Sequence, residues 1–132
     1  MPARVTYLDT SVALAHVLAE DERPPDELWT RTLVSSRLLE YEMWTRIHQR
    51  GLTDSHEGTV RAVLGRIAFL DLIPEVISRA GEPFPTPLRT LDALHLGTLE
   101  FVRAQGLAVD LAAYDERMCK AASAMQIPLY PL

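Results

Sequence analysis

Four carboxylates that lie far apart in the sequence could meet in one metal-binding site. Asp9 and Asp115 each follow a short apolar run, and Glu42 and Asp92 fall near the starts of two expected helices. Carboxylates that are brought together repel one another and raise each other's pKa values, and a divalent cation relieves this repulsion. Oxygen ligands suit Mg²⁺ or Mn²⁺ rather than Zn²⁺. Such a site can activate a water molecule and stabilise the transition state of phosphodiester hydrolysis.

Alternating short strands and helices are expected to position these carboxylates. This alternation favours a three-layer α/β/α fold, in which helices cover both faces of a mostly parallel sheet. The ends of parallel strands share one edge, where open α/β sheets bind their ligands. Residues 1–132 are expected to form one domain. Strands are expected at 4–8, 32–36, 70–74, 107–114 and 127–130, and the main helices at 12–19, 37–49, 54–70, 91–105 and 115–125.

Hydroxyl residues are expected to begin several of these helices. Ser11 and Thr90 are candidate N-caps, and either Ser35 or Ser36 can cap the helix over 37–49, because a hydroxyl oxygen accepts a free amide of the first turn. Gly51 is expected to end that helix in the left-handed conformation.

Composition indicates a globular protein without a disulfide framework. Hydrophobic residues make up 48% of the chain, charged residues 23%, and Cys119 is the single cysteine, which favours a reducing compartment. No apolar run reaches the roughly 20 residues of a membrane helix, so a soluble cytoplasmic protein is expected. The net charge of −5 neither supports nor excludes a nucleic-acid partner, because bound cations would offset the clustered acids.

Five short segments carry a resemblance to a known family. They are "YLDTSVAL", "SSRLLEYE", "LRTLDALHLGTL", and "AYDERMCKAA" followed by "IPLYP". In this order and at this chain length, the sequence resembles the PIN-domain family and, more narrowly, the VapC-type ribonuclease toxins of bacterial toxin–antitoxin pairs. "LRTLDALHL" is the most specific of these motifs. The resemblance therefore implies a PIN-like fold over nearly the whole chain.

The resemblance also implies an activity, a cofactor and partners. The expected protein is a Mg²⁺- or Mn²⁺-dependent endoribonuclease that is usually a homodimer, cleaves RNA and is inhibited by a cognate antitoxin protein. The implied acidic site is Asp9, Glu42, Asp92 and Asp115, with Asp9, Asp92 and Asp115 as the metal ligands and Thr10 or Ser11 as auxiliary residues. Arg89 and Arg117 neighbour these acids in the sequence and are candidates for contacts with substrate phosphates.

Two glutamates compete for one position in this site. Glu40 and Glu42 are about 200° apart around a helix, so both cannot point at the site. The spacing of Glu42 from the serine pair matches the family pattern, and Glu42 is the predicted site residue. Glu42 is also four residues before Arg46, and a surface ion pair worth about 0.3 kcal/mol is the alternative interpretation. Helix capping is the corresponding alternative for Asp9 and Asp115.

One departure from the family pattern keeps a non-catalytic alternative open. Many relatives carry threonine two residues before the last acid, where this chain has Ala113. Loss of that hydroxyl would favour a PIN-like module that binds RNA or protein with weak catalysis or none. A phosphoacceptor receiver domain fits poorly because Asp9 stands alone, and a dehalogenase-like phosphotransferase fits poorly because Ser11 replaces its second aspartate. His95 is expected to be a hydrogen-bonded structural residue, and Asp110 is a minor alternative to Asp115.

Overall fold

The sheet has four parallel strands, which place the ends of β1, β2 and β4 at one edge. The computed structural model describes residues 4–20 and 22–132. The strands are β1 (Arg4–Leu8), β2 (Leu33–Ser36), β3 (Ile67–Leu70) and β4 (Ala108–Ala112), arranged in the order β3-β2-β1-β4. The mostly parallel α/β sheet predicted from the sequence is confirmed.

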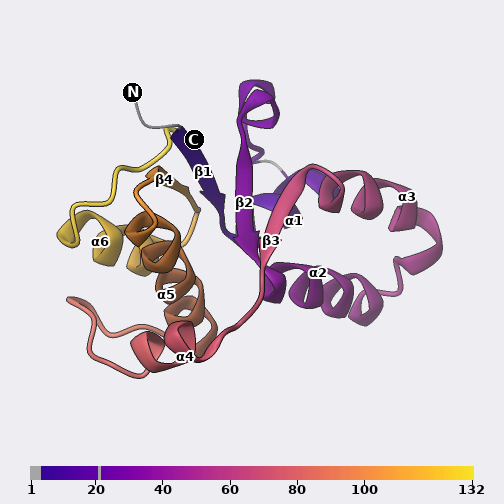
Figure 1. Cartoon of the computed structure of the whole chain (residues 1–132). Helices are drawn as coiled ribbons and strands as arrows, with labels where there is room; N and C mark the ends of the chain where they lie inside the picture. The colour runs from indigo at the N-terminus through magenta and orange to yellow at the C-terminus, as the bar shows by residue number, and fades with distance from the viewer. Residues whose placement is uncertain (1–3, 21) are drawn as a thin grey trace.

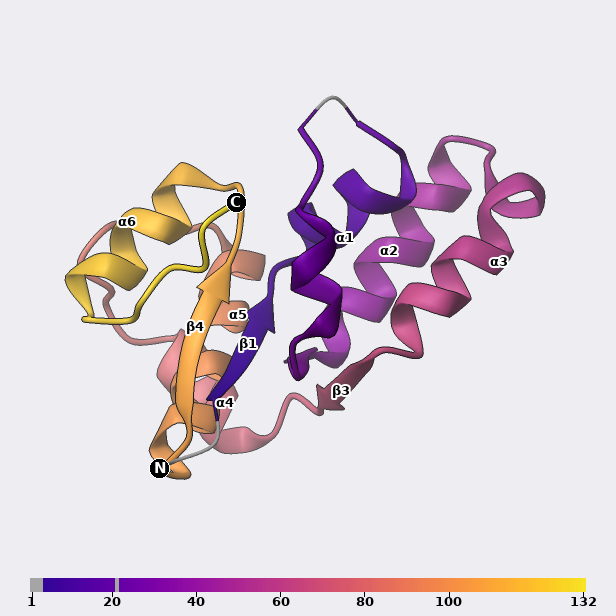
Figure 2. The ribbon, with the colours of Figure 1, turned by 90° about the horizontal axis from the view of Figure 1, so that it is seen from above.

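Helices cover both faces of the sheet, as Figures 1 and 2 show. One face carries α4 (Pro74–Ala80), α5 (Thr90–Ala104) and α6 (Glu116–Ala124). The other carries α1 (Thr10–Val17), α2 (Arg37–Gln49), α3 (Thr53–Leu64) and a 3₁₀ turn, η1 (Asp26–Thr30). None of the helices in the described ranges is long and apolar enough to span a membrane.

The alternation along β1 divides the core between these two faces. Val5 and Tyr7 pack with Leu96 and Leu99 of α5, whereas Leu8 packs with Met43 and other residues of α1 to α3. Successive strand residues point to opposite faces, so β1 contributes to both apolar layers. The buried centre of the fold therefore fixes the position at which β1 ends and Asp9 begins.

The region 54–74 differs from the sequence prediction. The helix expected over 54–70 ends at Leu64, with Gly65 as its C-cap, and β3 occupies 67–70. The strand expected at 70–74 is wrong, because Pro74 begins α4 instead. Proline is favoured at the first helical position, where its missing N–H has no partner to lose. The same apolar periodicity thus continues from α3 into β3.

Smaller differences concern helix starts and the C-terminal end. Asp9, not Ser11, is the N-cap of α1, and Arg89, not Thr90, precedes α5. The segment 127–130 forms an isolated bridge between Leu129 and Leu111 and not a full strand. Helix α2 has the predicted bounds, with the Ser36 hydroxyl accepting from Leu38 N at 3.1 Å and Gly51 at φ 68° after its end.

Candidate active site

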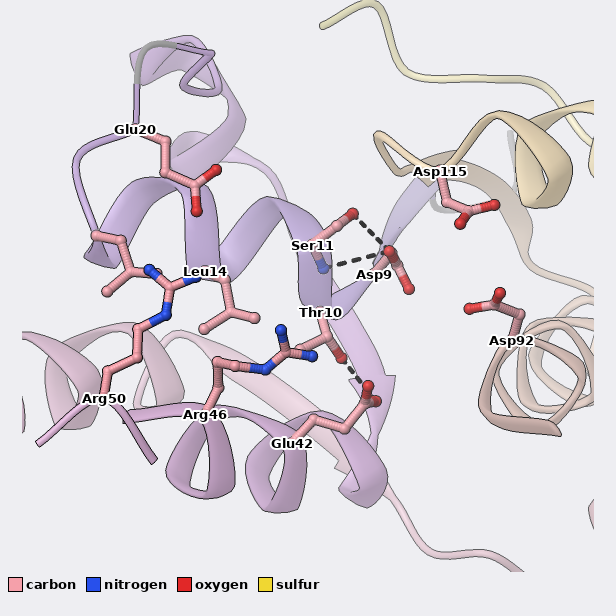
Figure 3. A pocket seen from close by; sticks show the side chains of 11 residues that line it. Asp9, Thr10, Ser11, Leu14, Glu20, Glu42, Arg46, Arg50, Asp92 and Asp115 are labelled. Carbon is pink, nitrogen blue, oxygen red and sulfur yellow. Dashed lines mark hydrogen bonds between the residues drawn. The ribbon is translucent and has the colours of Figure 1, made fainter. Parts of the chain in front are cut away.

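The structure brings the four predicted carboxylates to one pocket at the carboxyl edge of the sheet. Asp9 follows β1, Asp115 follows β4, Asp92 lies in the first turn of α5, and Glu42 lies on α2. The pocket has a volume of about 280 Å³ and is lined by all four, and Figure 3 shows Asp92 and Asp115 facing Asp9, with Glu42 on the opposite side. Asp9 and Asp115, which are more than a hundred positions apart in the sequence, thus line the same pocket.

Asp9 is held in place by the start of α1. Its Oδ2 accepts from the Ser11 backbone N at 3.2 Å and from Ser11 Oγ at 2.5 Å. Ser11 Oγ accepts in turn from Tyr114 N at 3.2 Å, which links this carboxylate to the loop after β4. Ser11 therefore orients Asp9, whereas the sequence interpretation made Ser11 the helix cap. Burial raises the pKa of Asp9 against the lowering influence of His95 and Ser11.

Glu42 is fixed by a buried network of hydrogen bonds. Thr10 Oγ1 donates to Glu42 Oε1 at 2.8 Å, and His95 Nε2 lies 2.7 Å from the same oxygen. The Tyr7 hydroxyl accepts from Ser36 N at 3.2 Å and lies 2.7 Å from His95 Nδ1. In the neutral imidazole, Tyr7 donates to Nδ1 and the Nε2 proton goes to Glu42. The Thr10 side chain thus contacts Glu42, and the network directs this carboxylate to one position.

The role of His95 extends the sequence interpretation. A hydrogen-bonded histidine was predicted, and the structure adds that its partners are Tyr7 and Glu42. Burial lowers the pKa of His95, but the hydrogen bond that His95 donates to Glu42 and the charge of Asp9 outweigh this and raise it. The three-residue step from Asp92 to His95 on one helix was the available signal, since such residues share a face.

Asp92 shows the electrostatic cost of the acidic cluster. The pKa of its half-buried carboxyl is raised to about 6, first by burial and then by the charges of Asp115 and Asp9. Asp115 is the N-cap of α6 and its Oδ1 accepts from Met118 N at 2.8 Å. Asp9 and Asp115 each cap a helix and also line the pocket, so a capping role does not exclude either residue from the site.

The oxygen donors fit a hard divalent cation that keeps part of its water. Within 4–20 and 22–132, no three His, Cys, Asp or Glu side chains are already close enough to enclose a metal ion. Mg²⁺ is commonly bound through one or two carboxylates and retains several waters, so a preformed cage is not required. Burial is the first cause of the raised pKa of Asp92, and the charges of Asp115 and Asp9 add a repulsion that a cation would relieve. Asp9, Asp92 and Asp115, which line the pocket, are the carboxylates that the sequence analysis expects to hold such a cation.

The predicted arginines are placed differently from each other. Arg89 lines a second pocket of about 410 Å³, which shares Glu42, Asp92 and Asp115 with the first. Arg117 is exposed on α6 and does not line either of these two pockets. The sequence analysis did not place in the site two other arginines that line the first pocket: Arg46 on α2, which also lines the second pocket, and Arg50, the C-cap residue after α2.

Two further sequence alternatives concern Ala113 and Asp110. Ala113 is buried in the core cluster beside α5 and α6 and is not a lining residue of the two carboxylate pockets. Asp110 accepts from Thr6 Oγ1 at 2.6 Å and pairs with Arg31 at 3.2 Å. Asp110 is therefore occupied by structural contacts away from Asp115, and it does not replace that residue in the pocket.

The raised pKa of Asp92 predicts a pH dependence of stability in metal-free buffer. A carboxyl with a folded pKa of about 6 and an unfolded pKa of about 3.9 favours the folded state at low pH. Its favourable contribution is complete below pH ~4 and is lost between about pH 4 and 6. The free energy of unfolding of wild type should therefore decrease between about pH 4 and 6. After allowance for solvent screening of this half-buried group, we expect this decrease to be smaller by about 1 kcal/mol in Asp92→Asn. Urea unfolding of both proteins across this pH range measures the difference. If the free energy of unfolding varies with pH equally in both, the ionisation of Asp92 is not its cause.

Comparisons with known proteins identify relatives over nearly the whole chain. The family model described as PIN domain matches residues 6–124. Ribonuclease VapC46 of Mycobacterium tuberculosis strain H37Rv is 37% identical over 128 residues, covering 90% of this chain and 91% of the relative. Ribonuclease VapC35 of the same species is 32% identical over 127 residues, covering 92% of each chain.

Solved structures share the fold at much lower sequence identity. A toxin–antitoxin complex from Klebsiella pneumoniae matches with a TM-score of 0.64 and 14% identity, covering 96% of this chain and 98% of the other. The crystal structure of VapBC2 from Rickettsia felis bound to a promoter DNA fragment matches with a TM-score of 0.70 and 12% identity, covering 96% and 97%. These likenesses support the fold described above.

Proposed function

The chain belongs to the PIN-domain family, and from this premise we propose that it is a metal-dependent endoribonuclease acting as the toxin of a toxin–antitoxin pair. The observation that carries the proposal is the convergence of Asp9, Glu42, Asp92 and Asp115 on one pocket. The names of the relatives, ribonucleases VapC46 and VapC35, support RNA as the substrate class. Phosphodiester hydrolysis is the reaction that such a carboxylate cluster serves when it binds divalent metal.

The proposed mechanism divides the carboxylates between metal binding and water orientation. Asp9, Asp92 and Asp115 would hold Mg²⁺ or Mn²⁺, directly or through water. When bound, the cation would supply Lewis-acid stabilisation of the phosphate oxygens and lower the pKa of a water molecule. Glu42 would accept a hydrogen bond from the attacking water, because Thr10 and His95 hold only one of its oxygens, Oε1. Ser11 would keep Asp9 in its binding orientation.

The partners proposed are an antitoxin protein and a second copy of this chain. The solved structures that share this fold include a toxin–antitoxin complex and VapBC2, which supports an antitoxin partner for this chain as well. The acidic pocket would attract a basic antitoxin side chain, because opposite charges complement each other across interfaces. We place the protein in the cytoplasm, where the RNA substrate is found.

The experiment that tests the proposed function is cleavage of a total RNA pool by the purified, antitoxin-free protein. We expect discrete products with Mg²⁺ or Mn²⁺ and none after EDTA treatment, with activity restored when the cation is returned. Circular dichroism of the EDTA-treated protein serves as the control for folding. A folded protein that yields no products under any of these conditions would favour a PIN-like binding module over the nuclease, and metal titration by calorimetry would show whether the carboxylates bind a cation.

A further inference from the structure

One acid and two arginines form a stripe that starts at the carboxylates and follows α2 to its C-terminal end. Glu42 and Arg46 on α2 and Arg50, the C-cap residue directly after it, follow at four-residue steps, which places them along one side of the helix, each about 6 Å along the axis from the last. All three line the pocket that contains the aspartates. Figure 3 shows Arg46 and Arg50 reaching toward α1, with Arg46 nearer the carboxylates.

Both guanidinium groups are free of partners in the part of the chain that the structure describes. Neither Arg46 nor Arg50 makes an ion pair or a side-chain hydrogen bond with residues 4–20 or 22–132, and both residues are exposed. The anticipated ion pair between Glu42 and Arg46 is therefore not formed, and Glu42 is engaged by Thr10 and His95 instead. Carboxylates pair elsewhere with Arg4, Arg31, Arg37, Arg61 and Arg79.

Electrostatics indicates a role for Arg46 and Arg50 in binding an anionic substrate. A polyanion that approaches four carboxylates on a chain of net charge −5 is repelled, and a bound cation offsets this only at the scissile phosphate. Flanking phosphates require other positive groups within a Debye length of about 8–10 Å. Arginine presents a planar fork that binds phosphate through two hydrogen bonds. Arg46 and Arg50 supply such forks on the α2 side of the pocket.

The α1 segment adds two apolar side chains to the same pocket. Leu14 and Leu18 of the α1 segment are half-buried and line it together with Arg46 and Arg50. Basic and apolar side chains in one pocket match a single nucleic-acid strand, whose phosphates and base faces need different surfaces. Glu20 lies at the outer end of the pocket, where its charge would repel the next phosphate and limit the length of the contact.

We propose that Arg46 and Arg50 bind two consecutive backbone phosphates of single-stranded RNA, on the side of the scissile bond that runs between α1 and α2. This inference rests on the proposed function and extends it to the path of the substrate. Arg89 lines the adjoining pocket with Glu42, Asp92 and Asp115, and Arg50 does not, so the strand would continue past the carboxylates toward α5. The arginine pair would act on RNA of any sequence, because phosphate contacts carry no base information.

Binding of a fluorescent, mixed-sequence single-stranded RNA to a cleavage-deficient Asp92→Asn protein tests this inference. Fluorescence anisotropy at several salt concentrations gives the slope of log K against log salt. Each phosphate contact with a single strand contributes about −0.7 to this slope. Arg46→Gln and Arg50→Gln are each expected to reduce its magnitude by about 0.7. The double variant is expected to reduce it by about 1.4 and to weaken binding on the order of 20-fold at 0.1 M salt.

Arg61→Gln is the matched control, because it changes the net charge equally and lies on α3, where Arg61 pairs with Glu57 at 3.0 Å. Glutamine is a good helix former, and melting curves should show all variants folded. If wild type cleaves RNA and the double variant keeps the slope of the Arg61→Gln control, the proposed path is wrong, and the stripe would suit an acidic protein instead. If wild type does not cleave and the Asp92→Asn protein does not bind RNA, the proposed function fails and this inference with it.

Discussion

Asp9→Asn is expected to abolish RNA cleavage and, in metal-free buffer, to raise the midpoint of thermal unfolding. Asparagine caps a helix as well as aspartate does, so the amide oxygen can still accept from Ser11 N at the start of α1. The substitution removes a buried negative charge that faces Asp92 and Glu42, and burial already raises the pKa of Asp9. Function and stability should therefore change in opposite directions. RNA cleavage with Mg²⁺ and scanning calorimetry with EDTA measure the two effects.

Asp9→Ala separates the charge of this residue from its capping role. Alanine also removes the charge but loses the acceptor for Ser11 N and Oγ. Loss of an N-cap costs about 1 kcal/mol, which corresponds to a decrease of roughly 3–5 °C in the midpoint for a domain of this size. We expect both variants to be inactive, with the asparagine variant the more stable. Retained cleavage in Asp9→Asn would contradict the metal-ligand role, and equal destabilisation of both variants would mean that the negative charge of Asp9, which both lose, stabilises the fold.

Local signals predicted the positions of Asp9 and Asp115, whereas the choice of Glu42 and the grouping of the four acids rested on the family resemblance. Helix α2 has the predicted bounds, since Ser36 provides a hydroxyl cap and Gly51 adopts a left-handed conformation after the helix. Asp9 and Asp115 follow strands whose apolar pattern ends abruptly. Once these strands are parallel, their ends must share an edge. The meeting of Asp9 and Asp115 thus follows from local patterns and one rule of topology.

The region around β3 could not be assigned in this way because its apolar residues continue one pattern across two elements. Val60 and Val63 belong to α3, whereas Ile67 and Leu70 belong to β3. Both sets fall at three- and four-residue steps, so periodicity alone extends the helix. The deciding factor is pairing of 67–70 with β2, which is a tertiary contact. Local sequence propensity yields to such contacts when a sheet edge is available.

The arrangement around Glu42 depends on contacts that local sequence does not encode. The prediction identified Thr10, Ser11 and His95 by residue type, but it could not assign Thr10 to Glu42 and Ser11 to Asp9. Thr10 and Glu42 are 32 positions apart in the sequence, whereas Ser11 and Asp9 are two positions apart. The same limit explains why Arg46 was interpreted as the partner of Glu42, since sequence spacing favours an i,i+4 pair that stronger buried partners prevent.

Glu42→Gln is expected to lower the rate of RNA cleavage by about 10²–10³-fold, which is the usual effect of removing one preorganised electrostatic or proton-accepting group. Glutamine retains the size of the side chain, and its amide oxygen can still accept from Thr10 Oγ1, so the fold should be preserved. The charge that orients the attacking water and completes the acidic cluster is lost. Single-turnover cleavage rates at saturating Mg²⁺ measure the effect.

Glu40→Gln provides the matched control on the same helix. Glu40 lies two residues earlier and pairs with Arg37 at 3.6 Å, and it is not a lining residue of either carboxylate pocket. An exposed pair of this kind contributes only about 0–1 kcal/mol to stability, so this variant should cleave RNA at the wild-type rate. Equal losses in both variants would mean that α2 affects cleavage through its net charge. Loss confined to Glu42→Gln would show that catalysis depends on the one carboxylate that Thr10 and His95 hold in the pocket.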